Sequence, residues 1–261
     1  MLLGSLVSRQ VAYSCQPERI KYWSFLCILL SIMRLDKFVC KSTELTRAEA
    51  VQRINSGGVC VNGDAITNEA TQVHENNTVV LDGIRLKARD FRYILMHKPA
   101  NTVCSNVDEF YPSLFNYLDV EKVSELHIVG RLDADTTGLV LITDDGRWSF
   151  NITVPSKACR KVYRVGLSYE IADDVVSKFK NGLRLQGEQQ VTLPATLEII
   201  EPKEVRLTIT EGKFHQVKRM LAAVGNRVVS LHREKIGNVS LDVDVGQWRY
   251  LTRDEIQSFS K

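Results

Sequence analysis

Strand-like segments follow one another along the second two thirds of the chain with few helices between them, and this order limits the available folds. Each segment is a short run rich in β-branched and aromatic residues, bounded by glycine, proline or polar residues. Because a doubly wound fold needs a helix after nearly every strand, the pattern predicts an α+β domain with a mixed or antiparallel sheet and flanking helices. We expect strands at about 126–129, 139–143, 161–167, 195–200, 205–210, 228–236 and 247–251, and helices at about 171–181, 215–224 and 253–259.

The composition fits a globular protein and leaves the nature of its partners open. The chain has 261 residues, of which 44% are hydrophobic, which is enough for one or two domains with their own cores. The formal net charge is only +3, so the charge of the whole chain does not indicate nucleic-acid binding. Between Arg206 and Lys235, however, seven Lys and Arg residues accompany two acidic residues, a local excess of five positive charges. This basic run could attract a polyanion, or it could be an ordinary solvated surface.

The cysteines and the missing motifs argue against a metal or cofactor. None of the six cysteines lies at C-x-x-C spacing, and no histidine lies at metal-ligand spacing from one of them. This usage is typical of reduced thiols in a cytoplasmic protein. The sequence also lacks the H-E-x-x-H, Walker and G-x-G-x-x-G motifs. We therefore expect no metal site and no cofactor.

Residues 1–32 do not follow the pattern of a folded domain. Basic residues precede an apolar stretch from Tyr22 to Met33, which is too short to span a bilayer as a helix and has no signal-peptide cleavage site after it. The first regular pattern begins directly at Met33. We expect residues 1–32 to be an upstream extension that is non-native or disordered, with Met33 as the natural start. A membrane anchor or signal peptide is the alternative interpretation.

Residues 33–91 predict a small domain of their own. Apolar positions spaced at i, i+3 and i+4 predict a first helix over 34–41, and a capping box at Thr46 predicts a second helix over 46–56. An Asn-Gly dipeptide then links two short strands in a tight hairpin. With L-D-K-F in front and G-G-V-x-V-N-G behind, this order resembles the S4 RNA-binding domain.

The resemblance to the S4 domain implies that this domain binds folded RNA. Phosphate contacts in such a domain come from basic side chains on its surface. Arg34, Lys37 and Lys41 form a basic stripe on the first helix. The candidate phosphate contacts are Arg34, Lys37, Arg47 and Arg53.

The segment Gly130-Arg131-Leu132-Asp133-Ala134-Asp135-Thr136-Thr137-Gly138 places an arginine and two carboxylates on a loop between two apolar runs. Catalytic side chains often lie on such loops, although a carboxylate there can also simply cap a turn. The longer string GRLDADTTGLVLITDDG resembles the catalytic motif of the RsuA-type pseudouridine synthases, which isomerise a uridine within ribosomal RNA. The resemblance extends from Met33 to about Phe259 and implies a catalytic domain over residues 92–261.

The resemblance implies a role for three side chains in the reaction. The enzyme breaks the N-glycosidic bond, turns the uracil and joins its C5 to the sugar, which needs no redox cofactor. Asp133 matches the essential carboxylate of the family, acting either as a nucleophile or in departure of the base. Tyr163 matches the tyrosine that stacks on the uracil and can take the C5 proton, although its spacing alone would suggest a ring in the core. Lys218, in E-G-K-F-H-Q-V-K-R-M, matches the cation that pairs with the aspartate and favours its ionised form.

Further residues of the same motifs are expected around this trio. Arg131 matches the arginine that helps to hold the target nucleotide outside its stack. We expect Arg219 to contact a phosphate or a structural partner, Asp135 to support the loop, and His215 to form a hydrogen bond.

The resemblance implies formation of pseudouridine at uridine 516 of 16S ribosomal RNA, by a cytoplasmic monomer that uses no membrane. Three alternatives stay open at this point. A sister enzyme of the same family would act on 23S ribosomal RNA, and an S4 protein could bind RNA without catalysis. A membrane-anchored protein would use the apolar stretch after Tyr22.

Overall fold

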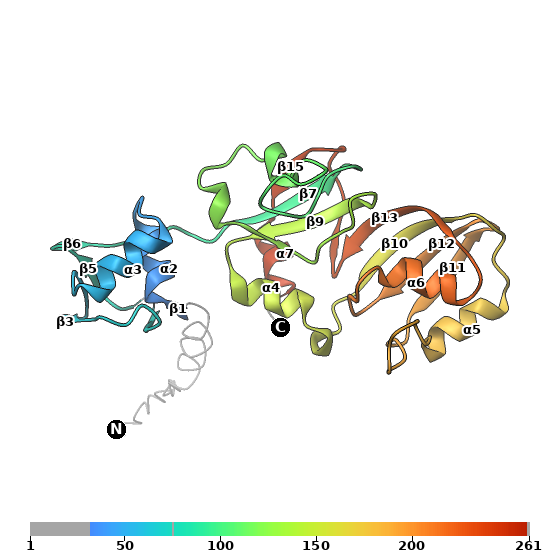
Figure 1. Ribbon diagram of the computed structural model, residues 1–261, viewed down its shortest axis with the longest axis horizontal. Helices are drawn as coiled ribbons and strands as arrows, with labels where there is room; N and C mark the ends of the chain where they lie inside the picture. Colours follow the sequence, from blue (N-terminus) through green and yellow to red (C-terminus); the bar gives the residue numbers. More distant parts are fainter. Residues whose placement is uncertain (1–31, 75, 260–261) are drawn as a thin grey trace, which may run out of the picture. The chain divides into compact units, whose positions relative to one another are not determined.

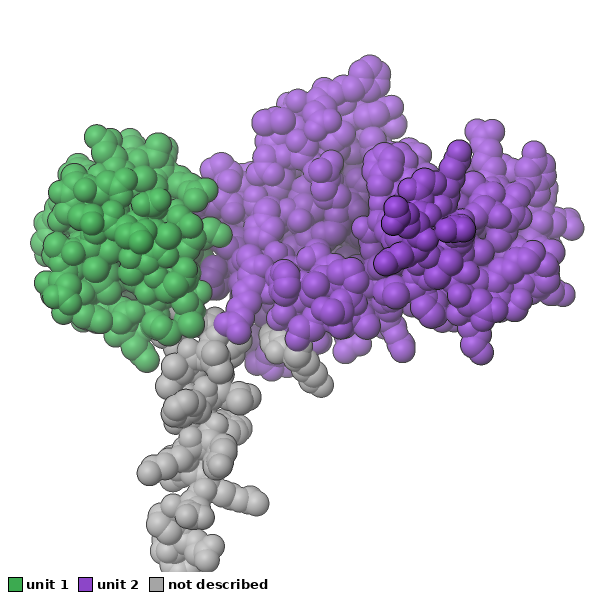
Figure 2. All heavy atoms as spheres, turned by 60° about the horizontal axis from the view of Figure 1, so that its bottom comes forward, with its two compact units in different colours: residues 1–90 green, residues 91–261 purple. Residues whose placement is uncertain are grey.

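A computed structural model of the protein describes residues 32–74 and 76–259, and the chain divides into two compact units. Unit 1 extends to Asp90 and unit 2 begins at Phe91 (Figure 2). The expectation for residues 1–32 lies outside the described residues except at Ile32. That residue belongs to the first strand, where it pairs with His74, so the described strand includes one position before Met33.

Unit 1 packs two short helices on small antiparallel strands. Leu35 and Val39 of the first helix and Ile54 of the second are fully buried in its hydrophobic cluster. The predicted capping box is confirmed, since the Thr46 hydroxyl accepts from the Glu49 N–H while the Glu49 carboxylate accepts from the Thr46 N–H. The elements are β1 (Ile32–Arg34), α2 (Leu35–Ser42), α3 (Arg47–Asn55), β2 (Val59–Val61), β3 (Asp64–Ala65), β4 (Gln72–His74), β5 (Val79–Leu81) and β6 (Ile84–Arg85).

Unit 2 is built on one mixed sheet (Figure 1). Its strands run in the order β11-β12-β10-β13-β9-β7-β15, with β8 paired to β9 and β14 to β13. The β9–β13 pair is parallel and the other pairs are antiparallel, which confirms the predicted α+β class. The strands are β7 (Tyr93–Lys98), β8 (His127–Val129), β9 (Thr137–Thr143), β10 (Lys161–Leu167), β11 (Thr196–Glu201), β12 (Glu204–Ile209), β13 (Val228–Ile236), β14 (Val239–Ser240) and β15 (Trp248–Tyr250).

Helices cover both faces of this sheet, and the central strands are therefore buried on both sides. In β9, Val140 and Ile142 join one hydrophobic cluster while Leu139 and Leu141 join another, as the alternation of side chains along a strand requires. The first cluster includes residues of α5 and α6, and the second includes residues of α4. The helices are α4 (Gly146–Thr153), α5 (Asp174–Asn181), α6 (Gln216–Ala223) and α7 (Arg253–Gln257), with 3-10 turns at Leu114–Tyr117, Val123–Glu125 and Pro155–Lys157.

The α4 helix was not expected from the sequence. Asp145 caps its N-terminus, with a carboxylate that accepts hydrogen bonds from the backbone N–H groups of Arg147 and Trp148. The Trp148 ring then packs into the second hydrophobic cluster. An Asp-Gly pair followed by a polar residue usually indicates a turn, so tertiary packing of the tryptophan decides that the chain continues as a helix.

Candidate active site

The segment Gly130–Thr136 joins β8 to β9, and the ammonium group of Lys98 holds its second half. Lys98 is fully buried at the end of β7, and its Nζ donates to the carbonyl oxygens of Ala134 (3.0 Å), Thr136 (2.8 Å) and Pro99 (3.0 Å). These three bonds use all three donors of the ammonium group. Burial lowers the pKa of Lys98. The backbone that follows Asp133 is thus fixed to a strand that lies more than thirty positions earlier in the chain.

The guanidinium of Arg233 holds both ends of the same loop. This side chain of β13 is only 1% exposed. It donates to the carbonyl oxygens of Gly130 at the start of the loop and of Leu139 in β9, each at 2.7 Å, and a third nitrogen lies 3.4 Å from the Tyr163 hydroxyl. In the sequence Arg233 is merely one member of the basic run. In the structure it is a buried connection between the loop and β10.

The Asp133 side chain is partly exposed and faces two cationic or potentially cationic groups. Its Oδ2 lies 3.1 Å from the Lys218 ammonium, and its Oδ1 lies 3.4 Å from Nε2 of His215. Lys218 also donates to both oxygens of Asp135, at 2.7 and 2.9 Å. Partial burial alone would lower the pKa of Lys218, but its bonds to the two carboxylates raise it above the ordinary value. The site therefore holds a charged lysine between two carboxylates.

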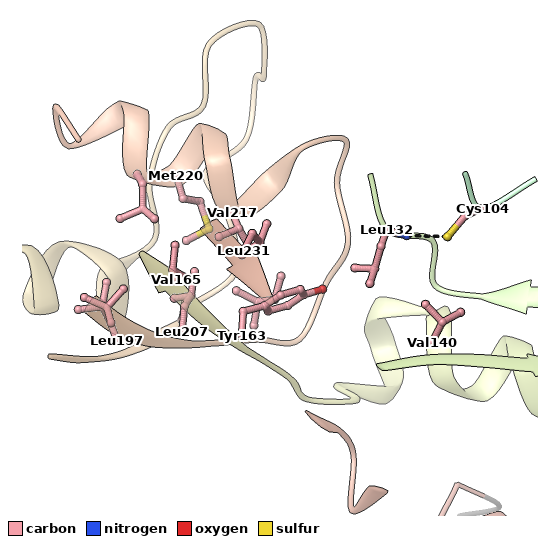
Figure 3. Packing of buried hydrophobic residues seen from close by; sticks show 14 of the residues in the cluster. Cys104, Leu132, Val140, Tyr163, Val165, Leu197, Leu207, Val217, Met220 and Leu231 are labelled. Carbon is pink, nitrogen blue, oxygen red and sulfur yellow. Dashed lines mark hydrogen bonds between the residues drawn. The ribbon is translucent and has the colours of Figure 1, made fainter. Parts of the chain in front are cut away.

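One hydrophobic cluster positions all three residues of the predicted trio. Leu132, Tyr163 and Val217 belong to it, so the neighbours of Leu132 and Val217 in the chain, Asp133 and Lys218, are placed at its rim. Figure 3 shows the Tyr163 hydroxyl pointing toward Leu132. The Tyr163 ring is 7% exposed and packs as a core side chain, while its hydroxyl lies 3.4 Å from Arg233, the side chain that binds the loop.

The remaining predicted residues of unit 2 lie in different environments. Arg131 is exposed on the loop beside Asp133. Arg219 is engaged within the protein, since it donates to Glu188 (3.1 Å) and to the backbone oxygens of Gln186 (2.6 Å) and Phe214 (3.1 Å). We expected Arg219 to contact either a phosphate or a partner within the protein, and the structure shows partners within the protein.

Several members of the basic run pair with acidic residues, some of them outside the run. Arg206 pairs with Glu198 and Glu234, and Lys213 pairs with Glu188. Together with buried Arg233, these pairs favour an ordinary charged surface over a continuous basic patch. Of the two interpretations that the sequence left open, the structure supports this one for most of the segment.

Some of the predicted phosphate contacts of unit 1 are exposed, whereas others form ion pairs with acidic side chains of the same unit. Lys37 is exposed, whereas the guanidinium groups of Arg34 and Arg47 both bind the buried carboxylate of Asp36, at 3.0 and 3.2 Å. Arg53 pairs with Asp82 at 3.1 Å, and both side chains of this pair are about half exposed. Lys41 is buried and only 5% exposed, so it cannot belong to a solvent-facing stripe.

Within residues 32–74 and 76–259, no group of three or more histidine, cysteine or acidic side chains comes together as metal ligands would. Among the same residues, no helix has the length and apolar character needed to cross a membrane.

Comparison with known proteins defines the class of this chain. Residues 92–223 match the RNA pseudouridylate synthase family, and residues 33–79 match the S4 domain. The chain belongs to the RNA pseudouridylate synthase family, and it is an isomerase with an S4 domain in front of its catalytic domain.

The chain is also similar to individual members of this family. The chain is 50% identical over 230 residues to the ribosomal small subunit pseudouridine synthase A of Vibrio parahaemolyticus, covering 87% of this chain and 99% of the relative. It is 47% identical over 229 residues to the protein of the same name from Escherichia coli K12, with the same coverage. A solved pseudouridylate synthase is 41% identical and matches with a TM-score of 0.64 over 87% of this chain and 99% of its own. The family expected from the sequence is thereby confirmed.

Proposed function

We propose that the protein converts one uridine of 16S ribosomal RNA to pseudouridine, at the position equivalent to uridine 516. The observation that carries the proposal is the partly exposed Asp133 carboxylate, which lies 3.1 Å from Lys218 on a loop held by buried cations. The names of the relatives support the choice of small-subunit RNA. We expect a monomer that acts in the cytoplasm, where this RNA is assembled into ribosomal subunits.

The proposed roles follow from how each group is held. Asp133 acts on the sugar or the base as the glycosidic bond breaks, and Lys218 keeps the carboxylate charged and oriented. Tyr163 supports the uracil with its ring, and its hydroxyl takes the proton from C5. Arg131, exposed beside Asp133, holds the extruded nucleotide.

Lys98 and Arg233 act indirectly in this proposal. Each is buried and donates to backbone carbonyls of the loop, so each fixes where Asp133 lies without reaching the substrate. Preorganised geometry of this kind saves the reorganisation that would otherwise raise the barrier.

Unit 1 is proposed to hold the RNA. The exposed Lys37 and the exposed parts of Arg47 and Arg53 are the candidate phosphate contacts. Arg34 is retained as a weaker candidate because it pairs with Asp36 and is less exposed than Arg47, which shares the same partner.

The test is pseudouridine mapping of both ribosomal RNAs from a strain that lacks this gene. We expect one small-subunit position to lose its pseudouridine and to regain it on expression of the wild-type chain. Loss of a large-subunit position would instead indicate the sister activity on 23S RNA. Unchanged maps of both RNAs would contradict an enzymatic role in ribosomal RNA and would favour an S4 protein that only binds.

A further inference from the structure

An exposed aromatic pair lies directly beside the Asp133 carboxylate. The Phe214 side chain is 75% exposed, and its ring stacks on that of His215 with the centroids 3.8 Å apart and the planes inclined by 21°. The His215 ring contacts Phe214 with its face and approaches Asp133 with its Nε2 edge, at 3.4 Å. The two rings thus form a short stack that begins at the carboxylate and ends in solvent.

The turn that carries Phe214 is held by polar groups on both sides. The buried Gln216 side chain accepts from the Lys213 N–H at 2.8 Å and donates to buried Glu211 at 2.7 Å. On the other side, Arg219 donates to the Phe214 carbonyl oxygen at 3.1 Å. The exposed ring therefore stands on a fixed backbone and not on a loosely held loop.

The backbone of His215 is also in an uncommon conformation. Its φ of 47° and ψ of 33° lie in the left-handed region, which costs a non-glycine residue on the order of 1 kcal/mol. Such strain persists only where surrounding contacts enforce it, and it gathers at functional sites. A single exposed phenylalanine needs no explanation on a protein surface. Here exposure, strain and a fixed turn coincide beside a reactive carboxylate.

We propose that the stacked rings of Phe214 and His215 form a platform for an unpaired nucleobase of the RNA, next to the uridine that reaches Asp133. The inference rests on the proposed function, because it takes RNA as the substrate. An aromatic ring with one face toward solvent is the usual support for a base outside a helix, and it accepts any base because every base has a π face. The exposed Arg131 adds positive charge for the strand.

The base on this platform is a neighbour of the target and not the target itself. The target uracil is assigned to Tyr163, whose hydroxyl points toward the catalytic loop (Figure 3). A base on the outer face of Phe214 would be separated from His215 by the whole Phe214 ring. Extruding a uridine unstacks the bases beside it, and a platform at this place replaces the stacking that one of them loses.

The test compares Phe214→Ala, Phe214→Leu and Phe214→Tyr in the full chain. The substrates are protein-free 16S ribosomal RNA and small ribosomal subunits from the strain that lacks this gene. Conversion is followed at the position that the wild type modifies, and affinity is measured over a range of salt concentrations. We expect the Ala and Leu variants to bind about 5- to 150-fold more weakly, the range that one base–aromatic stack is worth, and the Tyr variant to bind like the wild type.

The salt dependence separates stacking from phosphate binding. Because loss of a stack releases no counterions, the slope of log K against log salt should be the same for Phe214→Ala and the wild type. Tyr169→Ala is the matched control, since it removes another exposed ring of unit 2 (65% exposed) outside the site. Thermal unfolding should be unchanged in all variants because these rings are mostly in water.

Three results would overturn the inference. Phe214→Ala could equal Tyr169→Ala in affinity and rate, Phe214→Leu could bind like the wild type, or the loss of affinity could come with a shallower salt slope. If the wild type itself modifies neither RNA, the proposed function fails first and the platform fails with it.

Discussion

At the scale of single residues, Lys218 is shared between two carboxylates with different surroundings. Asp135 binds it at the shorter distances, 2.7 and 2.9 Å, but the Asp135 side chain is 70% exposed. Asp133, at 3.1 Å, is 30% exposed, so water screens its interaction less. The lysine can satisfy both carboxylates at once, and the contact with Asp135 limits the positions that its ammonium can occupy.

The first prediction concerns the carboxylate itself. Asp133→Asn should lower turnover by about 10³-fold or more, the scale seen when a reacting group is removed, while folding stays intact because the amide has the same shape. Asp174→Asn is the matched control, since Asp174 forms a similar 2.7 Å pair with Lys178 on the surface of the same unit. Isomerisation at a near wild-type rate by the purified Asp133→Asn variant would contradict the assignment of Asp133 as the catalytic carboxylate.

Tyr163→Phe distinguishes the contribution of the hydroxyl from that of the ring, because it removes only the hydroxyl. The ring is buried and should pack unchanged, whereas the 3.4 Å contact with Arg233 is lost. If the phenol takes the C5 proton, product formation should fall by roughly 10²- to 10⁴-fold, the usual value of a general base, with RNA affinity nearly constant. Single-turnover rates and equilibrium binding measure the two quantities, and an unchanged rate would restrict the role of Tyr163 to its ring.

At the scale of elements, the parallel pairing of β9 with β13 depends on a glycine. Gly138 pairs with Arg233 and has a φ of +108°. A Cβ atom added there would lie 2.4 Å from the Arg233 backbone oxygen and 2.6 Å from its nitrogen. Since Arg233 also holds Gly130 and contacts Tyr163, the closeness of the two strands determines the geometry of the site.

Gly138→Ala should therefore lose both stability and activity. Gly225→Ala is the control, because Gly225 has a φ of +81° but no atom within 4 Å of its added Cβ. We expect Gly138→Ala to reduce the free energy of unfolding by about 1–3 kcal/mol more than the control does, the usual cost of forcing an atom into a packed interior. Chemical denaturation of both variants tests this, and equal losses would show that only the backbone angle matters.

In unit 1, a buried carboxylate joins the two helices. Burial alone would raise the pKa of Asp36, but the guanidinium of Arg34, the Lys37 N–H and the guanidinium of Arg47 hold it below its ordinary value. A lowered pKa in the folded state means that the carboxylate stabilises the fold above its unfolded pKa. This stabilisation disappears as the pH falls through the folded pKa.

Asp36→Asn should destabilise unit 1 by about 1.5–3 kcal/mol at neutral pH, the range for hydrogen bonds to charged groups. The difference from the wild type should be constant near neutrality and should shrink below about pH 4, where the unfolded carboxyl is protonated. Hydrogen exchange of unit 1 within the full chain measures this difference in stability. A difference that persists undiminished at low pH would assign the effect to packing.

At the scale of the whole molecule, each unit has hydrophobic clusters of its own. Among residues 32–74 and 76–259, the hydrophobic clusters of unit 2 are formed by residues from Tyr93 onward, and the cluster of unit 1 is formed by residues between Met33 and Ala88. Each unit thus has a hydrophobic core of its own, as expected of a separate domain.

Removing unit 1 should weaken RNA binding and leave the catalytic fold intact. For a chain that starts near Arg92, each lost phosphate contact should reduce the slope of log K against log salt by roughly 0.7–0.9. Circular dichroism checks the fold, and titrations at several salt concentrations give the slope. The same slope as the full chain would mean that unit 1 does something other than hold RNA.

The amino-acid sequence alone determined the local elements and the class of the molecule. The capping box at Thr46, the strand pattern and the GRLD loop depend on neighbours a few positions apart, so they could be recognised without a structure. Helix α4 could not be recognised in this way, because it depends on the burial of Trp148 against distant residues. The sequence also left open whether the basic run between Arg206 and Lys235 is free to attract RNA, since the acids that neutralise its members come from other strands and loops.

Only the tertiary structure decided how the catalytic loop is held. Lys98 precedes the carbonyl groups it binds by 36 and 38 positions, and Arg233 follows the Gly130 carbonyl by 103 positions. In the sequence both are cations without an assigned role, because charge alone does not reveal burial. Folding removes both groups from water. A buried ammonium or guanidinium group is stable only if its hydrogen-bond donors have partners within the protein. The backbone oxygens of the loop satisfy them, and that requirement fixes the position of Asp133.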